Sequence, residues 1–159
     1  MRSILIVLSV ALVSCSSKPE ASPESTEKPT VSSNNDQKAY LDKAASEPGA
    51  QKTASGLVYR DVTAGSGASP KATDTVKVHY RGTLINGKEF DSSYARNEPA
   101  EFPLNRVIPC WTEGVQKMKV GGKARLVCPA NIAYGDASPT PDIPNGATLV
   151  FEIELLGIS

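Results

Sequence analysis

Four segments of the chain alternate apolar and polar residues, as a half-buried β-strand does. In TVKVHY, residues 75–80, every second side chain is apolar, and GLVYRDV and KARLVC follow the same rule. The segment TLVFEIELLGI would turn Glu152 and Glu154 away from the core. Asn86-Gly87 predicts a tight hairpin turn, in which both central residues have positive φ. These segments predict an antiparallel sheet.

A different spacing separates two of these strands. Trp111, Val115 and Met118 lie at positions i, i+4 and i+7, which places them on one face of a short helix. The glycine pair at 121–122 is expected to end this helix. The combination predicts an α+β fold, a strongly bent antiparallel sheet half-wrapped around one short α-helix.

The first residues are typical of an export signal. Residues 1–14 have a basic start and an apolar run of about ten residues, half the roughly 20 that a membrane-spanning helix needs. The segment LVSC at 12–15 resembles a bacterial lipobox, in which Cys15 is lipidated and becomes the mature N-terminus. An ordinary signal peptide with an incidental cysteine is the alternative. If the lipobox is used, acyl chains hold the protein at a membrane.

A polar segment follows the cysteine. Residues 15–37 are rich in Ser, Pro and Glu and contain no aromatic residue, so they are expected to form a disordered tether. Residues 38–52 are a short helical lead-in, with the helix itself from about Asp36 to Ser46. Tyr40, Leu41 and Ala44 give it a small apolar face. About three turns are too few for a dimerising arm, so a monomer is expected. Residues 53–159 form the folded domain.

Composition excludes several functions. The chain has 159 residues, enough for one ordinary domain, with 17 basic and 17 acidic side chains. Zero net charge gives no broad electrostatic argument for binding nucleic acid or an anionic membrane surface. The sequence has no glycine-rich phosphate loop, HExxH motif or CxxC pair. No cofactor or metal is therefore expected.

Two cysteines remain in the folded domain. Cys110 stands beside the only tryptophan, and Cys128 shares a strand face with Leu126, so both point toward the start of the central helix. In an oxidising envelope they are expected to form a disulfide, which would close a loop of about 17 residues and add roughly 3 kcal/mol. Two separate buried thiols or a metal site are the alternatives.

Aromatic residues from separate elements converge on the predicted core. The strand alternation turns Tyr80 and Phe151 inward, and the helical stripe turns Trp111 the same way. Composition alone favours a plain hydrophobic core. However, VKVHYRGTLINGKEFDSS, VIPCWTEGVQKMKVGGKARL, AYG and IPNGATLVFEIELL together resemble the FKBP family of peptidyl-prolyl cis–trans isomerases, from about residue 53 to the C-terminus. Several blocks match in order, which makes the resemblance specific, and the lipobox-like start resembles an envelope member.

The resemblance implies an FKBP-like pocket between the sheet and the helix. Trp111 would form its floor, and Ile143 matches a hydrophobic position in the last loop. The implied walls are Tyr80, Phe90, Val107, Ile108, Tyr134 and Phe151.

The resemblance also implies polar roles. The backbone N–H of Ile108 and the hydroxyl of Tyr134 would hold a substrate carbonyl. Asp91 matches an acidic pocket position, and a turn-forming role in FDSS, by hydrogen bonds to the local backbone, is the less favoured alternative and is compatible with the first. Arg96 would support Asp91, with a solvated loop charge as the alternative. Ala100 stands where the family often has an aromatic residue, which predicts an altered preference before proline and weaker binding of macrolides, the family's candidate small ligands.

The resulting hypothesis is a prolyl isomerase that acts on proline-containing polypeptides and assists the folding of exported proteins. Ser16 after the lipidated cysteine favours an outer-membrane anchor facing the periplasm. The alternatives are a non-catalytic peptide-binding module or holdase that uses the same pocket, and a structural surface lipoprotein that only retains the fold.

Overall fold

The computed structural model describes residues 33–159, so the predicted signal peptide, the predicted lipidation site at Cys15 and most of the expected tether lie outside the described residues. The helices are α1 (Asn34–Ala45) and α2 (Pro109–Lys117), with short 3-10 helices η1 (Leu104–Arg106) and η2 (Ala130–Ile132). The strands are β1 (Ala50–Lys52), β2 (Val58–Thr63), β3 (Thr75–Leu84), β4 (Glu89–Ser92), β5 (Ala100–Pro103), β6 (Lys123–Cys128) and β7 (Leu149–Ile158).

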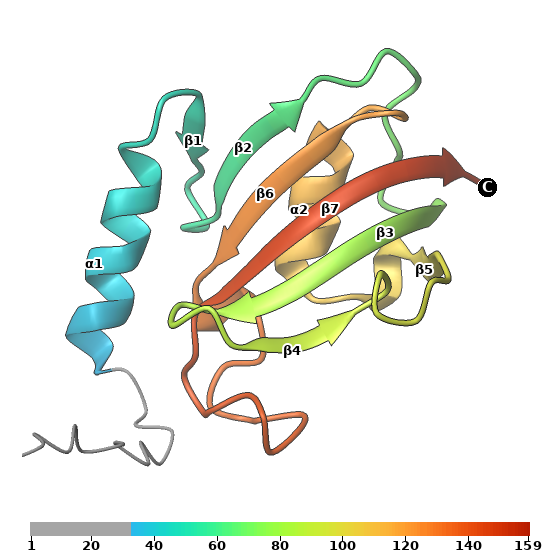
Figure 1. Cartoon of the computed structure of the whole chain (residues 1–159). Coiled ribbons are helices and arrows are strands. Elements are labelled where there is room, and N and C mark those ends of the chain that lie inside the picture. Colours follow the sequence, from blue (N-terminus) through green and yellow to red (C-terminus); the bar gives the residue numbers. More distant parts are fainter. Residues whose placement is uncertain (1–32) are drawn as a thin grey trace, which may run out of the picture.

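All seven strands belong to one antiparallel sheet. Its order is β1-β2-β6-β7-β3-β4, and β5 pairs with part of β3. Figure 1 shows the sheet curving around α2, which lies behind β6 and β7. The predicted fold class is confirmed, as are the four strands found by alternation. Strands β1, β4 and β5 have three or four residues, too few for alternation to be seen in the sequence.

The concave face of the sheet holds the main core together with α2. Trp111, Val115 and Met118 are all buried, as their spacing predicted. Helix α2 ends at Lys117, however, before the glycine pair at 121–122 that was expected to end it. The helix ends early because the chain after it bonds to an upstream loop. The N–H of Val120 donates to the carbonyl of Ala68 at 3.0 Å.

Helix α1 covers the opposite, convex face. Its Ala44 packs on Val58, Val127 and Val150, which point away from α2, with Tyr40 and Leu41 at the edge of this contact. The predicted apolar face of this helix is therefore confirmed. The helix begins earlier than expected, because the Ser33 side chain and the N3 carboxylate form a capping box at its first turn. Residues 34–37, which were assigned to the expected tether, are therefore helical. No helix within residues 33–159 is long and apolar enough to cross a lipid bilayer.

The hairpin between β3 and β4 differs from the predicted turn. Only Gly87 has a positive φ, +85°, whereas Asn86 does not. The N–H of Leu84 donates to the carbonyl of Lys88 at 2.8 Å, so three residues form the loop. The Asn86 side chain accepts a hydrogen bond from the Lys88 N–H at 2.9 Å and stabilises this wider turn.

Candidate active site

A cavity of about 310 Å³ opens between the concave face of the sheet and the start of α2. Strands β3, β4, β5 and β7 supply one side, while η1, α2 and the loop after η2 supply the other. Ten residues line it: Tyr80, Phe90, Asp91, Phe102, Arg106, Val107, Ile108, Trp111, Tyr134 and Phe151. Eight of the predicted site residues are thus brought together around one hollow.

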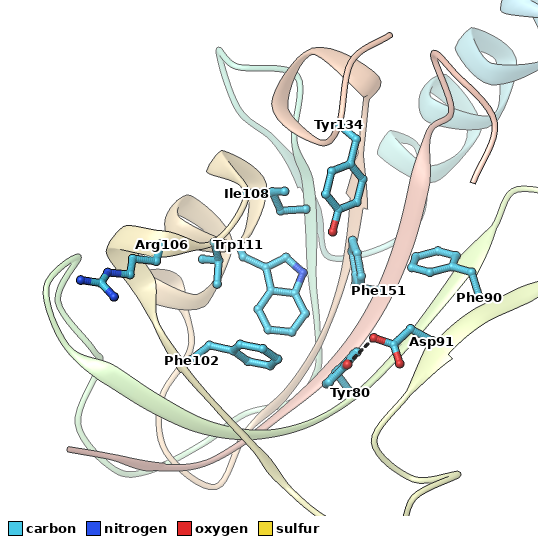
Figure 2. Close-up of a pocket in the computed structure, with 10 residues that line it drawn as sticks. Tyr80, Phe90, Asp91, Phe102, Arg106, Ile108, Trp111, Tyr134 and Phe151 are labelled. Atoms are coloured by element: carbon cyan, nitrogen blue, oxygen red, sulfur yellow. Dashed lines mark hydrogen bonds between the residues drawn. The ribbon is translucent and has the colours of Figure 1, made fainter. Parts of the chain in front are cut away.

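Aromatic rings form the floor and walls of this cavity. The indole of Trp111, only 5% exposed, packs nearly perpendicular to Tyr80, Phe102 and Phe151, with ring centroids 5.3–5.4 Å apart. Phe90 extends the wall from Phe151 at 5.7 Å. Edge-to-face contacts of this kind hold aromatic rings in defined orientations. The indole is therefore a fixed surface at the bottom of the hollow (Figure 2).

Two lining residues were absent from the predicted site. Phe102 lies two positions after Ala100 in β5, on the same side of the strand. The wall that Ala100 was expected to lower is thus lined by the ring of Phe102, while Ala100 packs against the core. Arg106 is the other, at the end of η1. Neither β5 nor η1 is long enough to show a periodic pattern of apolar residues. For Phe102, its place two residues after Ala100 was the only available signal.

A charged cluster stands at one wall of the cavity. Arg96 donates from Nη1 to Asp91 Oδ1 at 2.6 Å and from Nη2 to the hydroxyl oxygen of Tyr80 at 2.9 Å. The Tyr80 hydroxyl in turn donates to the other carboxylate oxygen of Asp91, as Figure 2 shows. The arginine that the resemblance paired with Asp91 therefore lies beside it, although it does not line the cavity.

This cluster fixes the protonation states of its members. Burial alone would raise the pKa of Asp91, but the hydrogen bonds from Tyr80 and Arg96 outweigh it, and the pKa of Asp91 is lowered. Burial, followed by the hydrogen bond to Asp91, raises the pKa of the Tyr80 phenol. At neutral pH the wall therefore carries a carboxylate neutralised by Arg96, and a phenol whose proton is already shared.

Three donors that belong to residues lining the cavity have no hydrogen-bond partner among residues 33–159. The Tyr134 hydroxyl points into the hollow in Figure 2. Burial and then the charge of Asp91 raise the pKa of Tyr134, so it keeps its proton. The N–H of Ile108 precedes α2, and only the carbonyl of this residue bonds within the helix. Trp111 Nε1 is buried and has no hydrogen-bond partner in the part of the chain described. A ligand carbonyl in the cavity would satisfy the Tyr134 hydroxyl or the Ile108 N–H.

One residue of the predicted site lies elsewhere. Ile143 is 5% exposed and packs into the core instead of lining the cavity. Its N–H donates to the carbonyl of Thr140 at 3.1 Å, and its carbonyl accepts a hydrogen bond from the Ser138 hydroxyl. These bonds close a tight turn that directs the Ile143 side chain inward.

The cysteine pair lies in the core beside the residue that forms the floor. Cys110 and Cys128 form a disulfide with their Cα atoms 5.8 Å apart, and both are fully buried. The bond joins the first turn of α2 to the last residue of β6. It therefore anchors the residue next to Trp111 to the sheet.

The domain combines a bent antiparallel sheet, one central helix and an aromatic hollow with donors on its rim. This arrangement is suited to binding an apolar group beside a carbonyl. No Ser, Thr, Cys, His or Lys side chain lines that hollow. The chain belongs to the FKBP-type peptidyl-prolyl cis-trans isomerase family, which matches residues 67–156.

Named relatives agree with this assignment. The chain is 54% identical over 121 residues to the FKBP-type peptidyl-prolyl cis-trans isomerase FkpA of Escherichia coli K12, covering 76% of this chain and 44% of that protein. It is 51% identical over 119 residues to the FKBP-type 22 kDa isomerase of the same strain, covering 75% of this chain and 58% of the relative. The chain thus spans about half the length of these two relatives.

Solved structures share the fold. The crystal structure of FkpA from Escherichia coli aligns with a TM-score of 0.76 at 52% identity, over 79% of this chain and 58% of that one. A peptidyl-prolyl cis-trans isomerase from Pseudomonas syringae pv. tomato aligns with a TM-score of 0.74 at 35% identity, over 82% of this chain and 98% of that one.

Proposed function

We propose that this protein catalyses cis–trans rotation of X–Pro peptide bonds in polypeptides. The observation that carries the proposal is the cavity itself, in which a fixed indole forms the floor and the Ile108 N–H and the Tyr134 hydroxyl are unpaired donors. A proline ring fits such an apolar floor, and the donors suit the carbonyl of the preceding residue. Family membership supports the same reaction.

Rotation about an X–Pro bond breaks no covalent bond, so the site needs no nucleophile. The barrier to amide rotation, about 18–20 kcal/mol, comes from the lost resonance between nitrogen and carbonyl. Water stabilises the polar planar amide more than the twisted one, and a cavity walled by aromatic rings removes that water. Fixed donors then bind the rotated carbonyl better than the planar one, which lowers the barrier through differential binding.

The required effect is modest. The uncatalysed reaction takes tens to hundreds of seconds. Lowering the barrier by about 4–6 kcal/mol accelerates rotation by roughly 10³ to 10⁴. Desolvation and two hydrogen bonds to a displaced carbonyl together supply a barrier reduction of this size, because removing a single such donor lowers kcat about 10²–10³-fold in some enzymes.

The charged cluster has a supporting role in this mechanism. A bare carboxylate at the wall would repel the oxygen of a substrate carbonyl. Arg96 neutralises Asp91, and the shared proton of Tyr80 occupies the second carboxylate oxygen. The cluster thereby keeps the Tyr80 ring in place as a wall without placing an unpaired negative charge beside the reacting amide.

The direct test is a kinetic assay of peptide isomerisation with a series of X–Pro peptides, followed by coupled proteolysis or by NMR exchange. Tyr134→Phe is expected to lower kcat/KM about tenfold, since it removes one donor and keeps the ring. Tyr94→Phe is the matched control, because Tyr94 is a similarly exposed tyrosine whose hydroxyl bonds to Glu154, outside the cavity. If the unaltered protein accelerates rotation in no X–Pro peptide, the function is that of a binding module or holdase.

We further propose that the protein works in the cell envelope on exported polypeptides. The support is the sequence of residues 1–15, with its apolar run and the lipobox-like cysteine. A disulfide within the domain agrees with an oxidising compartment. Labelling cells with a radioactive fatty acid tests the anchor, since Cys15→Ala is expected to abolish label. Uptake of label by that variant would exclude Cys15 as the site.

Two finer proposals concern partners. The single short helix α1 is occupied by contacts with its own sheet, which supports a monomer. Light scattering after gel filtration gives the mass directly, and a dimer would contradict this. Macrolides of the kind bound by the family are proposed as weak ligands of the cavity. Titration monitored by the fluorescence of Trp111, the only tryptophan in the chain, would measure their affinity.

A further inference from the structure

The cavity has one charge that no other group balances. Of its ten lining residues only Asp91 and Arg106 are charged, and Asp91 is held by Arg96 and Tyr80. Arg106 is exposed and forms no ion pair or side-chain hydrogen bond within residues 33–159. The rim of the site is therefore positive at this point.

The backbone of Arg106 is well anchored although its side chain is free. Leu104, two residues before Arg106, is fully buried, and its carbonyl accepts a hydrogen bond from the Thr112 hydroxyl of α2 at 2.6 Å. Arg106 stands two residues before Ile108, whose N–H is the proposed carbonyl donor. In Figure 2 its guanidinium extends outward along the rim, away from Trp111. It is placed to meet the part of a bound chain that leaves the cavity.

The charges nearest the other side of the cavity are already paired. Lys88, in the β3–β4 hairpin, and Asp142, in the loop after Tyr134, form an ion pair at 2.9 Å. This pair joins the segment that carries Phe90 to the loop that carries Tyr134, and its two charges cancel. Arg96 is likewise paired with Asp91, so Arg106 is the one unpaired cation among the described residues at the cavity.

We infer that Arg106 makes this site select X–Pro segments that carry an Asp or Glu side chain near the proline. The inference rests on the proposed isomerase function and names its substrate class. A residue adds at most about 3.6 Å of chain, so a carboxylate within roughly two residues of the proline comes within reach of the guanidinium. Arginine binds carboxylates through two parallel N–H donors, which makes it a better partner than a point charge.

The test uses tryptophan-free peptides of one length with a single proline, in which the flanking position is Glu, Gln or Lys, placed before or after the proline. Binding is read from Trp111 fluorescence and turnover from kcat/KM. The full chain is expected to bind and turn over the best-placed Glu peptide about three- to fivefold better than its Gln counterpart, with Lys the poorest. The preference should shrink in 1 M salt, where the Debye length is about 3 Å.

Three variants locate the effect. Arg106→Gln is expected to reduce the Glu-to-Gln ratio to about one, and Arg106→Glu to reverse it in favour of Lys. Lys38→Gln is the control, since it removes one positive charge from an exposed position on α1, across the sheet from the cavity, and should leave the ratio unchanged.

The outcomes separate this inference from the proposed function. If the unaltered protein isomerises the Gln peptides but shows equal binding and turnover for Glu, Gln and Lys at both positions, the inference fails and the isomerase function stands. A Glu preference that survives in Arg106→Gln also overturns it. If no peptide is bound or turned over, both proposals fail together.

Discussion

Breaking the Cys110–Cys128 disulfide should destabilise the whole domain. The two cysteines are 18 residues apart, and closing a loop of that length lowers the entropy of the unfolded chain by about 11 cal/mol/K. At 25 °C this corresponds to about 3 kcal/mol of stability lost on reduction. Because domains are stable by only about 5–15 kcal/mol, the loss is a large fraction of the total.

The assay is urea unfolding followed by the fluorescence of Trp111, with and without reductant, in a Cys15→Ala background so that only this pair responds. With a slope of about 1.5–2 kcal/mol/M, the midpoint should fall by about 1.5–2 M on reduction. The double variant Cys110→Ala/Cys128→Ala is the control, since reductant should not shift its midpoint. An unchanged midpoint in protein whose thiols are shown by alkylation to be reduced would refute the reasoning.

The effect on catalysis should be smaller than the effect on stability. Helix α2 is also held by the close approach of Gly114 to Leu126 and by the buried side chain of Val115. The indole of Trp111 is expected to keep its three ring contacts after reduction, because none of them involves a sulfur atom. In the absence of denaturant, kcat/KM of the reduced protein is therefore expected to stay within about threefold of the oxidised value, a change of less than about 0.7 kcal/mol.

Three further predictions follow from close contacts and from charge. Gly114→Ala should destabilise by about 1–3 kcal/mol in thermal unfolding, because its Cβ would lie 2.1 Å from Leu126 Cδ2; a gain in stability, as alanine usually gives in a helix, would contradict this. Gly82→Ala should raise KM about threefold or more, since its Cβ would lie 2.6 Å from Phe90 Cζ and displace that wall; an unchanged KM would show that the wall does not contact substrate. The Asp91 pKa is lowered, so the stability it contributes is present above its unfolded value near 4 and is lost as pH falls through the folded value. The difference in unfolding free energy between the unaltered protein and Asp91→Asn should thus be constant from about pH 5 to 8 and shrink below about pH 4; a difference that changes around pH 6–7 would implicate another group.

The accuracy of the sequence-based prediction depended on element length. Strands β3 and β7 have ten residues each, so alternation identified them and placed Tyr80 and Phe151 on the concave face. Strand β5 has four residues and η1 has three, and the ring of Phe102 went unrecognised. The predicted hairpin turn was wrong because the Asn86 side chain accepts a hydrogen bond from the Lys88 N–H, which favours a three-residue loop over the two-residue loop that the dipeptide predicts.

Helix α1 docks on the sheet through contacts with residues far from it in the sequence, which the pattern of α1 alone does not predict. The sequence of two strands nevertheless indicates that this face is covered. Val127 in β6 and Val150 in β7 are apolar residues at positions that alternation assigns to the outer face. A strand with apolar residues on both sides is usually covered on both sides. These two positions could have indicated a second cover on the sheet, although not that α1 supplies it.

The length of the elements also distinguishes the residues proposed to rotate the X–Pro bond from the residue proposed to select the substrate. The indole floor, the Tyr80 and Phe151 walls and the Ile108 donor are set by β3, β7 and the start of α2, whose patterns extend over many residues. Arg106 is set by η1, a three-residue segment that carries no pattern. Under the two proposals, the long elements therefore provide for rotation of the X–Pro bond, and the short segment before α2 provides the preference for a flanking side chain. In this chain η1 places an unpaired guanidinium at the edge of an otherwise charge-balanced hollow.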